Sequence, residues 1–343
     1  MHNLQTIPGR TAIINNKTFL FFSGYDYLAI GTNEAFKQLV IEGIEKYGWL
    51  FPSSRISNTQ LSLYKTFETQ LALDFGFKNC VSFSSGFNAA NAAVNLFKDD
   101  HEILASPFCH PALGVQAASH DSFEDWSDFV INTVHQTTNK KPAVIVTDAV
   151  NIFTAKIFCF DFLKEITQPV ICIIDDSHGL QITGSKGLGI AEILPENKNV
   201  TYIICASLSK GLHINGGVVF CNDNNIIRRL QQQFYYTAST AISPALMYAY
   251  LHAKSIYSNA YDHLKINMQT VNAFYRPATA LQLPIIILPA SAGDEQMQAK
   301  NIIISSFNYP TPQSPRVNRA IINAAHTKND INYLLETLNS IAL

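Results

Sequence analysis

The sequence contains little charge and no long hydrophobic run. Of its 343 residues, 15% are charged and 47% are apolar, a balance typical of a globular chain with a large core. Because the formal net charge is −2 and basic residues do not cluster, we expect no nucleic-acid partner. Because no apolar stretch approaches the length that crosses a bilayer, we expect no membrane span either.

Cysteine pairs and a signal-like N-terminus are also missing. The six cysteines are scattered and none belongs to a Cys-x-x-Cys pair, which favours buried free thiols over zinc or a disulfide framework. Asp175 and His178 do not have the spacing of a known zinc site, so we expect no metal. Residues 1–10 lack the apolar segment of a secretory signal, and the default expectation is a cytoplasmic protein.

Short β-branched runs alternate with helical patterns through most of the chain. Most runs are continuously apolar, as in strands covered on both faces, and the alternation predicts an α/β fold with a mainly parallel sheet between helices. The expected strands are Cys80–Phe83, Ile103–Ala105, Ala143–Thr147, Val170–Ile174, Tyr202–Ala206 and Gly217–Cys221. The expected helices are Glu34–Tyr47, Thr59–Leu73, Gly86–Phe97 and Pro111–Ser119.

The last hundred residues have a different pattern. A long helical stretch begins near Ser243 and runs into the 270s, and a small α+β unit follows it. Its expected elements are the strands Pro284–Pro289 and Ile302–Ser306 and a helix over Thr327–Asn339. We therefore divide the chain into an N-terminal segment (1–35), a large α/β domain (36–245), and a unit of long helix and small C-terminal α+β domain (246–343).

A polar cluster follows the apolar run that starts at Val170. Asp175, Asp176 and His178 come directly after this predicted strand, at the edge where open α/β sheets bind ligands. Buried charge is costly unless it is paired, so either a binding site or an ion-paired strand end explains the cluster. The glycines that follow match neither the dinucleotide-binding pattern nor the P-loop pattern.

A lysine stands in a similar position after the next predicted strand. Lys210 follows the run that ends at Ala206, with hydroxyl groups at Ser207 and Ser209 and a glycine-rich turn after it. A lysine near a strand end is most often a surface residue. If Lys210 is desolvated, it loses basicity and becomes a nucleophile for an aldehyde.

The third informative segment is residues 80–93, in which a strand passes through Ser85 and Gly86 into a helix. The N-terminus of a helix presents free amides and the positive end of the dipole, and so forms an anion site. A simple helix cap by Ser85 explains the same residues. Only the combination with the two preceding segments favours a phosphate site.

Together these segments resemble the α-oxoamine synthases, a branch of the fold-type I pyridoxal-phosphate enzymes, and among them the 8-amino-7-oxononanoate synthases of biotin synthesis. Further matching segments occur in the family's order along nearly the whole chain. They are residues 22–30 (FSGYDYLAI), 52–68 (PSSRISNTQLSLYKTFE), 234–245 (FYYTASTAISPA) and 319–326 (RAIINAAH). The resemblance implies a seven-stranded type of sheet and a small C-terminal α+β domain.

The resemblance also implies pyridoxal 5'-phosphate as the cofactor. Lys210 binds it as a Schiff base and later serves as the general base. Asp175 pairs with the protonated ring nitrogen, His178 contacts the phenolic oxygen of the ring, and His110 stacks on the ring face. These four residues are the implied catalytic set, and no metal is needed.

Three further roles are implied in the same way. The cofactor phosphate is bound by Ser85, Gly86, Phe87 and Ser207. Thr240 reaches the phosphate from the second subunit of a homodimer with a shared active site. Arg319 binds the carboxylate of the amino-acid substrate, a task suited to a forked guanidinium.

The implied reaction joins an amino acid to an acyl thioester with decarboxylation to an aminoketone. L-Alanine and pimeloyl-CoA or a pimeloyl carrier protein are the implied substrates. Two alternatives stay open, namely another fold-type I enzyme (a glycine or serine C-acyltransferase or an aminotransferase) and a catalytically idle homologue that acts as a partner protein. The second rests on departures from the family, above all DAVNIFTAKIF at 148–158 in place of an S-M-D-G-D-like segment. Tyr25 also replaces the usual Asn, and Tyr64 the usual His.

Overall fold

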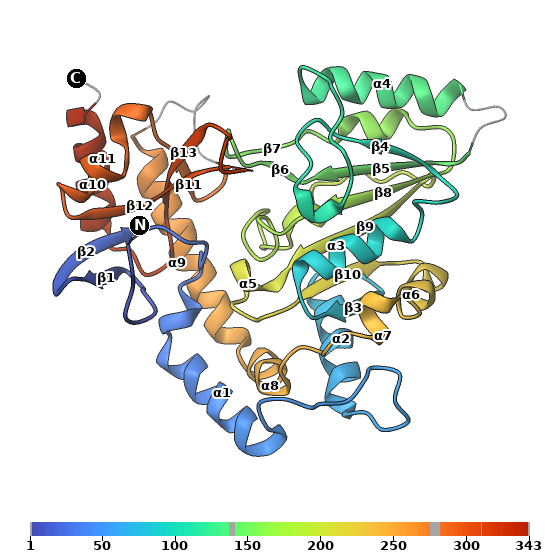
Figure 1. Cartoon of the computed structure of the whole chain (residues 1–343), viewed down its shortest axis with the longest axis horizontal. Coiled ribbons are helices and arrows are strands. Elements are labelled where there is room, and N and C mark those ends of the chain that lie inside the picture. The colour runs from blue at the N-terminus through green and yellow to red at the C-terminus, as the bar shows by residue number, and fades with distance from the viewer. Residues whose placement is uncertain (1, 137–140, 275–281, 310, 342–343) are drawn as a thin grey trace.

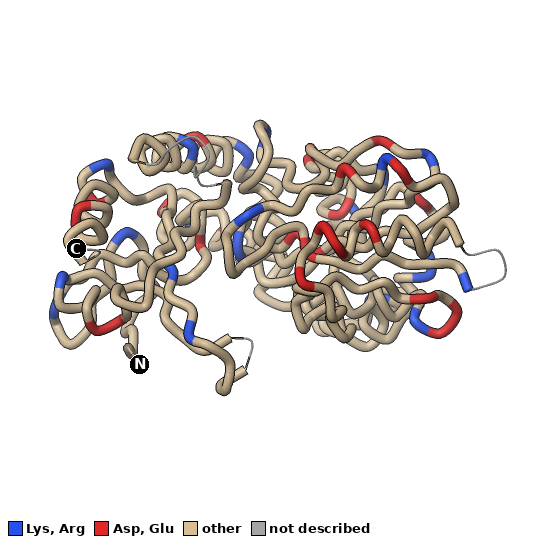
Figure 2. Tube along the Cα trace, turned by 90° about the horizontal axis from the view of Figure 1, so that it is seen from above, with Lys and Arg blue, Asp and Glu red and all other residues tan. Residues whose placement is uncertain are grey.

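The structure contains two larger β-sheets with their covering helices and a two-stranded ribbon (Figure 1). It is a computed structural model, and it describes residues 2–136, 141–274, 282–309 and 311–341. The large sheet lies on the right of Figure 1 and the small sheet on the left, with helix α9 between them. Basic and acidic residues are spread through both parts of the molecule (Figure 2).

The large sheet contains the strands that were expected in the α/β part of the chain. In spatial order they are β3 (Asn79–Phe83), β10 (Gly217–Cys221), β9 (Val200–Ser207), β8 (Val170–Asp175), β5 (Ala143–Asp148) and β4 (Glu102–Ala105). Strands β4, β5, β8 and β9 are parallel, and β10 is antiparallel to both of its neighbours. All six expected strands are confirmed to within two residues at either end.

The number of strands differs from the seven-stranded type that the resemblance implied. Among the described residues the large sheet has six strands. Between β4 and β5 the described residues form a 3-10 helix, η2 (Pro111–Leu113), and a helix, α4 (Phe123–Gln136). The connecting residues 115–122 contain a single β-branched residue, so local preference does not favour a strand there.

Both faces of the large sheet are buried, as the continuously apolar strands predicted. Along β5, Val144 and Val146 pack in one core cluster with the alanines of helix α3, whereas Ile145 packs in the cluster on the opposite face. The helices around this sheet are α1 (Glu34–Tyr47), α2 (Ser62–Asp74), α3 (Gly86–Asn95), α5 (Leu208–Gly211), α6 (Asn224–Leu230) and α7 (Phe234–Thr237). The other short elements of this part are η1 (Ile30–Thr32), η3 (Asp161–Glu165), η4 (Gly189–Glu192) and the two-stranded ribbon of β6 (Val150–Asn151) and β7 (Lys156–Ile157).

Two expected helices differ from the structure. The helix expected over Pro111–Ser119 ends after one turn, because Gly114 adopts the left-handed conformation with φ 64°. The long stretch from Ser243 is two helices, α8 (Pro244–His252) and α9 (Lys254–Asn272), separated at the fully buried Ala253. In the part of the chain that the structure covers, no helix has the length and apolar character needed to cross a membrane.

The small sheet joins the two ends of the chain. Its strands, in spatial order, are β1 (Thr11–Ile14), β2 (Lys17–Phe22), β12 (Ile302–Asn308), β13 (Arg316–Ile321) and β11 (Ile285–Ile287). Strand β2 is parallel to β12, so the N-terminal hairpin belongs to the same sheet as the C-terminal strands. The remaining elements of this part are η6 (Ala290–Ala292), α10 (Asp294–Gln298) and α11 (Lys328–Ile341). The domain boundaries drawn from the sequence remain a prediction.

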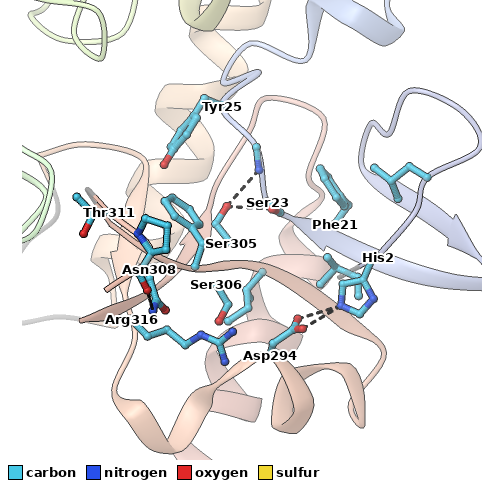
Figure 3. A pocket seen from close by; sticks show the side chains of 16 residues that line it. His2, Phe21, Ser23, Tyr25, Asp294, Ser305, Ser306, Asn308, Thr311 and Arg316 are labelled. Carbon is cyan, nitrogen blue, oxygen red and sulfur yellow. Dashed lines mark hydrogen bonds and ion pairs between the residues drawn. The ribbon is translucent and has the colours of Figure 1, made fainter. Parts of the chain in front are cut away.

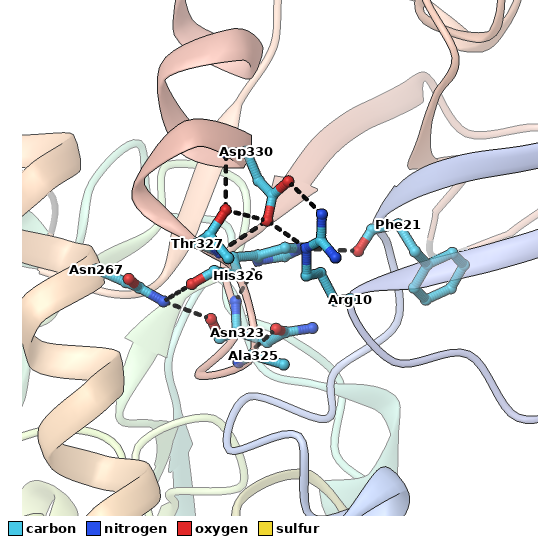
Figure 4. Close-up of polar contacts among 8 residues, drawn as sticks. All are labelled: Arg10, Phe21, Asn267, Asn323, Ala325, His326, Thr327 and Asp330. Atoms are coloured by element: carbon cyan, nitrogen blue, oxygen red, sulfur yellow. Dashed lines mark hydrogen bonds and ion pairs between the residues drawn. The ribbon is translucent and has the colours of Figure 1, made fainter.

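Polar contacts fasten the N-terminal hairpin to the start of α11 (Figure 4). Arg10 forms an ion pair of 2.6 Å with Asp330, which also accepts from the Thr327 hydroxyl. His326 Nε2 lies 3.1 Å from the carbonyl oxygen of Phe21, and its Nδ1 accepts from the Asn323 amide at 3.0 Å. Burial lowers the pKa of His326 to about 4, so this histidine is neutral at physiological pH.

Candidate active site

One cavity of about 430 Å³ collects nearly all of the residues that the sequence predicted for the site. It lies at the carboxyl ends of β5, β8 and β9, where open α/β sheets bind ligands. The predicted residues that line it are Ser85, Gly86, Phe87, His110, Asp175, His178, Ser207, Lys210 and Arg319. Thr240 is exposed and does not line this cavity, so its predicted reach into a second subunit stays a prediction.

Lys210 enters the cavity from the short helix α5. Ser207 ends β9 and accepts a hydrogen bond from the Ser209 amide, which turns the chain into α5. The Lys210 amine lies 2.9 Å from Nε2 of His178. Burial lowers the pKa of Lys210, although the charges of Asp175 and Asp148 oppose the shift. The amine therefore loses its proton more easily than an exposed lysine does.

His178 connects Lys210 to a buried tyrosine. Its Nδ1 lies 2.8 Å from the hydroxyl of Tyr27, and burial lowers the pKa of His178 well below its ordinary value. When the Lys210 amine is protonated it can only donate, so Nε2 accepts and Nδ1–H donates to the Tyr27 oxygen. The neutral imidazole is thereby fixed between the two groups.

Two carboxyl groups lie side by side at the ends of neighbouring strands. Asp148 at the end of β5 is paired in register with Asp175 at the end of β8. Burial raises the pKa of Asp148 well above its ordinary value, and the charge of Asp175 raises it further. Asp148 also accepts a 2.6 Å hydrogen bond from the His110 amide and so holds that histidine at the cavity.

The N-terminus of α3 approaches the Lys210 loop closely enough to require glycine. A Cβ on Gly86 would lie 2.6 Å from the Cβ of Ser207, and a Cβ on Gly217 would lie 2.6 Å from the Cα of Gly86. The first amides of a helix have no partner within the helix, and here they line the cavity together with Ser207. This arrangement suits a phosphate group.

Arg319 is a fully buried cation with unused donors. It lies on β13 with 1% of its surface exposed, and its Nε and Nη2 have no hydrogen-bond partner among the residues that the structure describes. Its Nη1 donates to the Tyr25 hydroxyl at 3.0 Å. Because Arg319 lines the cavity, its free edge is available to a carboxylate in the same space.

Sequence reasoning gave no role to several residues of the cavity, among them Asp148, Tyr25 and Tyr309. Asp148 ends a predicted strand, so the rule that placed Asp175 at the site would also have found it. Tyr25 was noted only as a departure from the family, yet its ring lies 5.7 Å from the Lys210 amine. Tyr309 stacks at 6.2 Å on His110 and follows a strand of the small sheet, and no local signal in the sequence pointed to it.

Known proteins similar to this chain carry consistent names. An 8-amino-7-oxononanoate synthase of Yersinia enterocolitica is 28% identical over 362 residues, which cover 97% of this chain and 92% of that protein. The 8-amino-7-oxononanoate synthase of Photobacterium profundum is 25% identical, with 94% and 88% covered. No protein-family model matches the chain.

Solved structures agree in fold. A serine palmitoyltransferase of Sphingomonas wittichii has a TM-score of 0.82 at 16% identity, covering 99% of this chain and 92% of that chain. An 8-amino-7-oxononanoate synthase of Francisella tularensis has a TM-score of 0.68 at 22% identity, covering 94% and 98%. The expected fold class is thus confirmed. The chain resembles the 8-amino-7-oxononanoate synthases in sequence along almost its whole length, and it has the fold of the fold-type I pyridoxal-phosphate enzymes.

Proposed function

We propose that the chain is a pyridoxal-phosphate-dependent enzyme whose cofactor is bound covalently by Lys210. The observation that carries the proposal is one cavity that combines a lysine of lowered pKa with a carboxylate and a buried arginine with free donors. Solved serine palmitoyltransferases of the same fold contain this cofactor. A surface lysine beside a structural ion pair does not explain why Arg319 is buried with unpaired donors.

The residues of the cavity fit the parts of the cofactor. The α3 N-terminus with Ser207 offers donors to a phosphate, and Asp175 offers a negative charge to a cationic ring nitrogen. Burial raises the pKa of Asp148 well above its ordinary value, so Asp148 can carry a proton beside the negative charge of Asp175. The hydrogen bond from its amide to Asp148 fixes the backbone of His110, which suits an imidazole that packs against the cofactor ring. When bound, pyridoxal phosphate acts as an electron sink for the α-carbon of an amino acid.

The protein groups then handle the substrate and its protons. The Nε–Nη2 edge of Arg319 binds the amino-acid carboxylate, because Nη1 is already engaged by Tyr25. Lys210, with its pKa lowered by burial, accepts the α-proton as general base. His178 holds the lysine amine at 2.9 Å and is itself oriented by Tyr27.

The finer proposal is a decarboxylating C-acyltransferase that joins L-alanine to a pimeloyl thioester and forms an aminoketone. It is supported by the names of the curated relatives and by the coverage of more than nine tenths of this chain. We also propose a homodimer in which Thr240 contributes to the partner's site. Another fold-type I enzyme and an idle homologue remain the competing functions.

The first experiment is an absorbance spectrum of the protein incubated with pyridoxal phosphate. We expect a visible band that borohydride fixes covalently to the protein, and we expect Lys210→Ala to lose it. Lys186→Ala, which changes an exposed lysine in the loop after β8, is the matched control and should keep the band. A colourless protein would leave the idle homologue as the better account.

The second experiment separates the enzyme classes. With L-alanine, glycine or L-serine in turn, carbon dioxide release should require an acyl thioester if the protein is a C-acyltransferase. With L-alanine, a release of pyruvate that depends on an added keto acid would indicate an aminotransferase instead. The amino acid and the acyl chain with the highest kcat/KM identify the substrates, and a preference for glycine or serine would contradict the alanine proposal.

A further inference from the structure

A second cavity, of about 840 Å³, adjoins the active-site cavity and shares Tyr25 and Phe307 with it. Strands β2 and β12 line it, and its walls are mostly apolar, including Phe21, Ile304 and Phe307. Figure 3 shows Tyr25 and Arg316 at opposite sides of this cavity, with Ser305 and Ser306 between them. The two cavities therefore meet at Tyr25, beside Arg319 and Lys210.

The cavity exists because β2 ends before β12 does. The parallel pairing stops at Phe22 opposite Ile304, whereas β12 continues to Asn308 with β13 as its neighbour. Beyond Phe22 the N-terminal chain contacts β12 through the Ser305 hydroxyl, which bonds the Ser23 hydroxyl at 2.9 Å and the Gly24 amide at 3.3 Å. The last residues of β12 thus form an open sheet edge along the cavity.

The hydrogen-bond pattern indicates which groups of this edge are free. The Tyr309 amide, just after β12, donates to the Pro315 carbonyl at 3.4 Å and so faces β13. Asn318, which lies opposite Ser306, accepts instead from the Leu288 amide at 2.9 Å, on the side of β13 that faces β11. Since successive residues of an antiparallel strand point alternately toward and away from the partner, Ser306 and Asn308 direct their backbone groups away from β13. An extended ligand with amide groups can pair with them as a further strand does.

One end of the cavity offers a cation, Arg316, to an anionic group. The Arg316 side chain is exposed and makes no hydrogen bond or ion pair with any residue that the structure describes, whereas the carboxylate of Asp294 is paired with His2 at 3.1 Å. Arg316 and Arg319 are three residues apart on β13 and so lie on opposite faces of the sheet. A ligand that passes over the open edge therefore meets Arg319 and Lys210 at one end and Arg316 at the other.

We propose that this cavity binds the 4'-phosphopantetheine arm of the acyl thioester, with its phosphate at Arg316 and its amides on the edge of β12. The arm combines a reactive thioester end, two amides in an extended chain and a phosphate at the far end, in the order that the cavity requires. A dicarboxylic acyl chain also ends in an anionic group, but it has no amides that could pair with the edge of β12. The inference rests on the proposed acyltransferase function and assigns the thioester to a particular side of the site.

Direct binding tests the inference without turnover. Coenzyme A and free 4'-phosphopantetheine are titrated into the cofactor-loaded protein by calorimetry. We expect both to bind and Arg316→Gln to weaken each about ten-fold, as expected for loss of a charge-assisted contact to phosphate. Arg316→Lys should recover part of the affinity. Arg228→Gln, on the exposed face of α6, is the matched control and should change nothing.

Kinetics distinguish the arm from the acyl tail. With a coenzyme A thioester, Arg316→Gln should raise KM about ten-fold and leave kcat and the KM of the amino acid unchanged. With the matching N-acetylcysteamine thioester, which lacks the phosphate, the variant should behave as the parent. An equal rise in KM with the truncated thioester would place the acyl tail at Arg316 and overturn the inference.

The sheet edge has its own test. Ser306→Pro removes an N–H that faces away from β13, and Ser306→Ala keeps that N–H while losing only the hydroxyl bond to Asn318. Proline alone should weaken coenzyme A binding, while both variants retain the cofactor band. If the Ser306→Pro protein does not fold, the Arg316→Gln and Arg316→Lys variants alone test the inference.

The results also separate the possible sources of the arm. Tight binding of coenzyme A indicates the free thioester, and tighter binding of an acyl carrier protein than of free phosphopantetheine indicates the carrier. An active enzyme with an unaffected Arg316→Gln variant would overturn this inference and leave the proposed function standing. A protein without the Lys210 spectrum would refute the proposed function itself.

Discussion

Replacing Arg319 by methionine should stabilise the cofactor-free protein while abolishing binding of the amino acid. Arg319 is 1% exposed, and within the described part of the chain its Nε and Nη2 lack hydrogen-bond partners. Each buried donor without a partner costs about 1–3 kcal/mol, although the adjoining cavity admits water and favours the lower end of that range. The substitution also loses the bond to Tyr25 and the contact of the guanidinium with the Phe307 ring at 5.7 Å, which offset part of the gain. We expect the free energy of unfolding to rise by about 1 kcal/mol.

The loss of function should be much larger than the gain in stability. A guanidinium that binds a carboxylate through two charge-assisted hydrogen bonds contributes about 3 kcal/mol, or roughly 100-fold in affinity. Urea unfolding followed by tryptophan fluorescence measures the free energy of unfolding. Spectral titration of the cofactor-loaded protein with L-alanine measures the affinity for the amino acid. The exposed Arg316→Met on the same strand is the control, expected within about 0.5 kcal/mol of the parent. A less stable Arg319→Met protein, or one with unchanged affinity for the amino acid, would refute the reasoning.

Two further predictions concern other parts of the molecule. Burial lowers the pKa of His326 from 6.5 to about 4, so between these two pH values the unfolded chain binds more protons than the folded protein does. The free energy of unfolding should therefore fall as the pH drops through this range, by up to about 3 kcal/mol. Urea unfolding at pH 7 and 4.5 should show a smaller fall for His326→Gln, and equal falls would contradict this account. Gly86→Ala should destabilise the protein by about 1–3 kcal/mol and weaken binding of pyridoxal phosphate, because the new Cβ would lie 2.6 Å from Ser207. Gly293→Ala is the control, because its Cβ would meet the end of the Gln296 side chain at 3.1 Å and the Ala290 carbonyl at an ordinary 3.6 Å. Equal effects of the two changes would argue against the close approach at Gly86.

Local pattern was enough to predict the large sheet and most of its cavity. Continuous apolar runs such as the one from Val170 are long enough to identify strands covered on both sides, and strand β10 was predicted with its observed bounds. In a parallel sheet the carboxyl ends of the strands meet at one edge, so the positions of Asp175 and Lys210 after two successive strands already implied that they meet. The motif resemblance added His110 and Arg319 to the site, although these residues lie far from Asp175 and Lys210 in the sequence.

Only the tertiary structure decided the contacts between the two ends of the chain. The pairing of β2 with β12 joins residues 282 positions apart, such as Leu20 and Ile302, and nothing in either segment specifies the other. That pairing brings Tyr25 to Arg319 and leaves the end of β12 open. The break at Ala253 is of the same kind, because no proline or glycine marks it and the residue is fully buried in the packed interior. Short-range preferences fix strands and helix caps, whereas long-range packing selects which edges pair, where a helix bends and which buried donors remain free for a substrate.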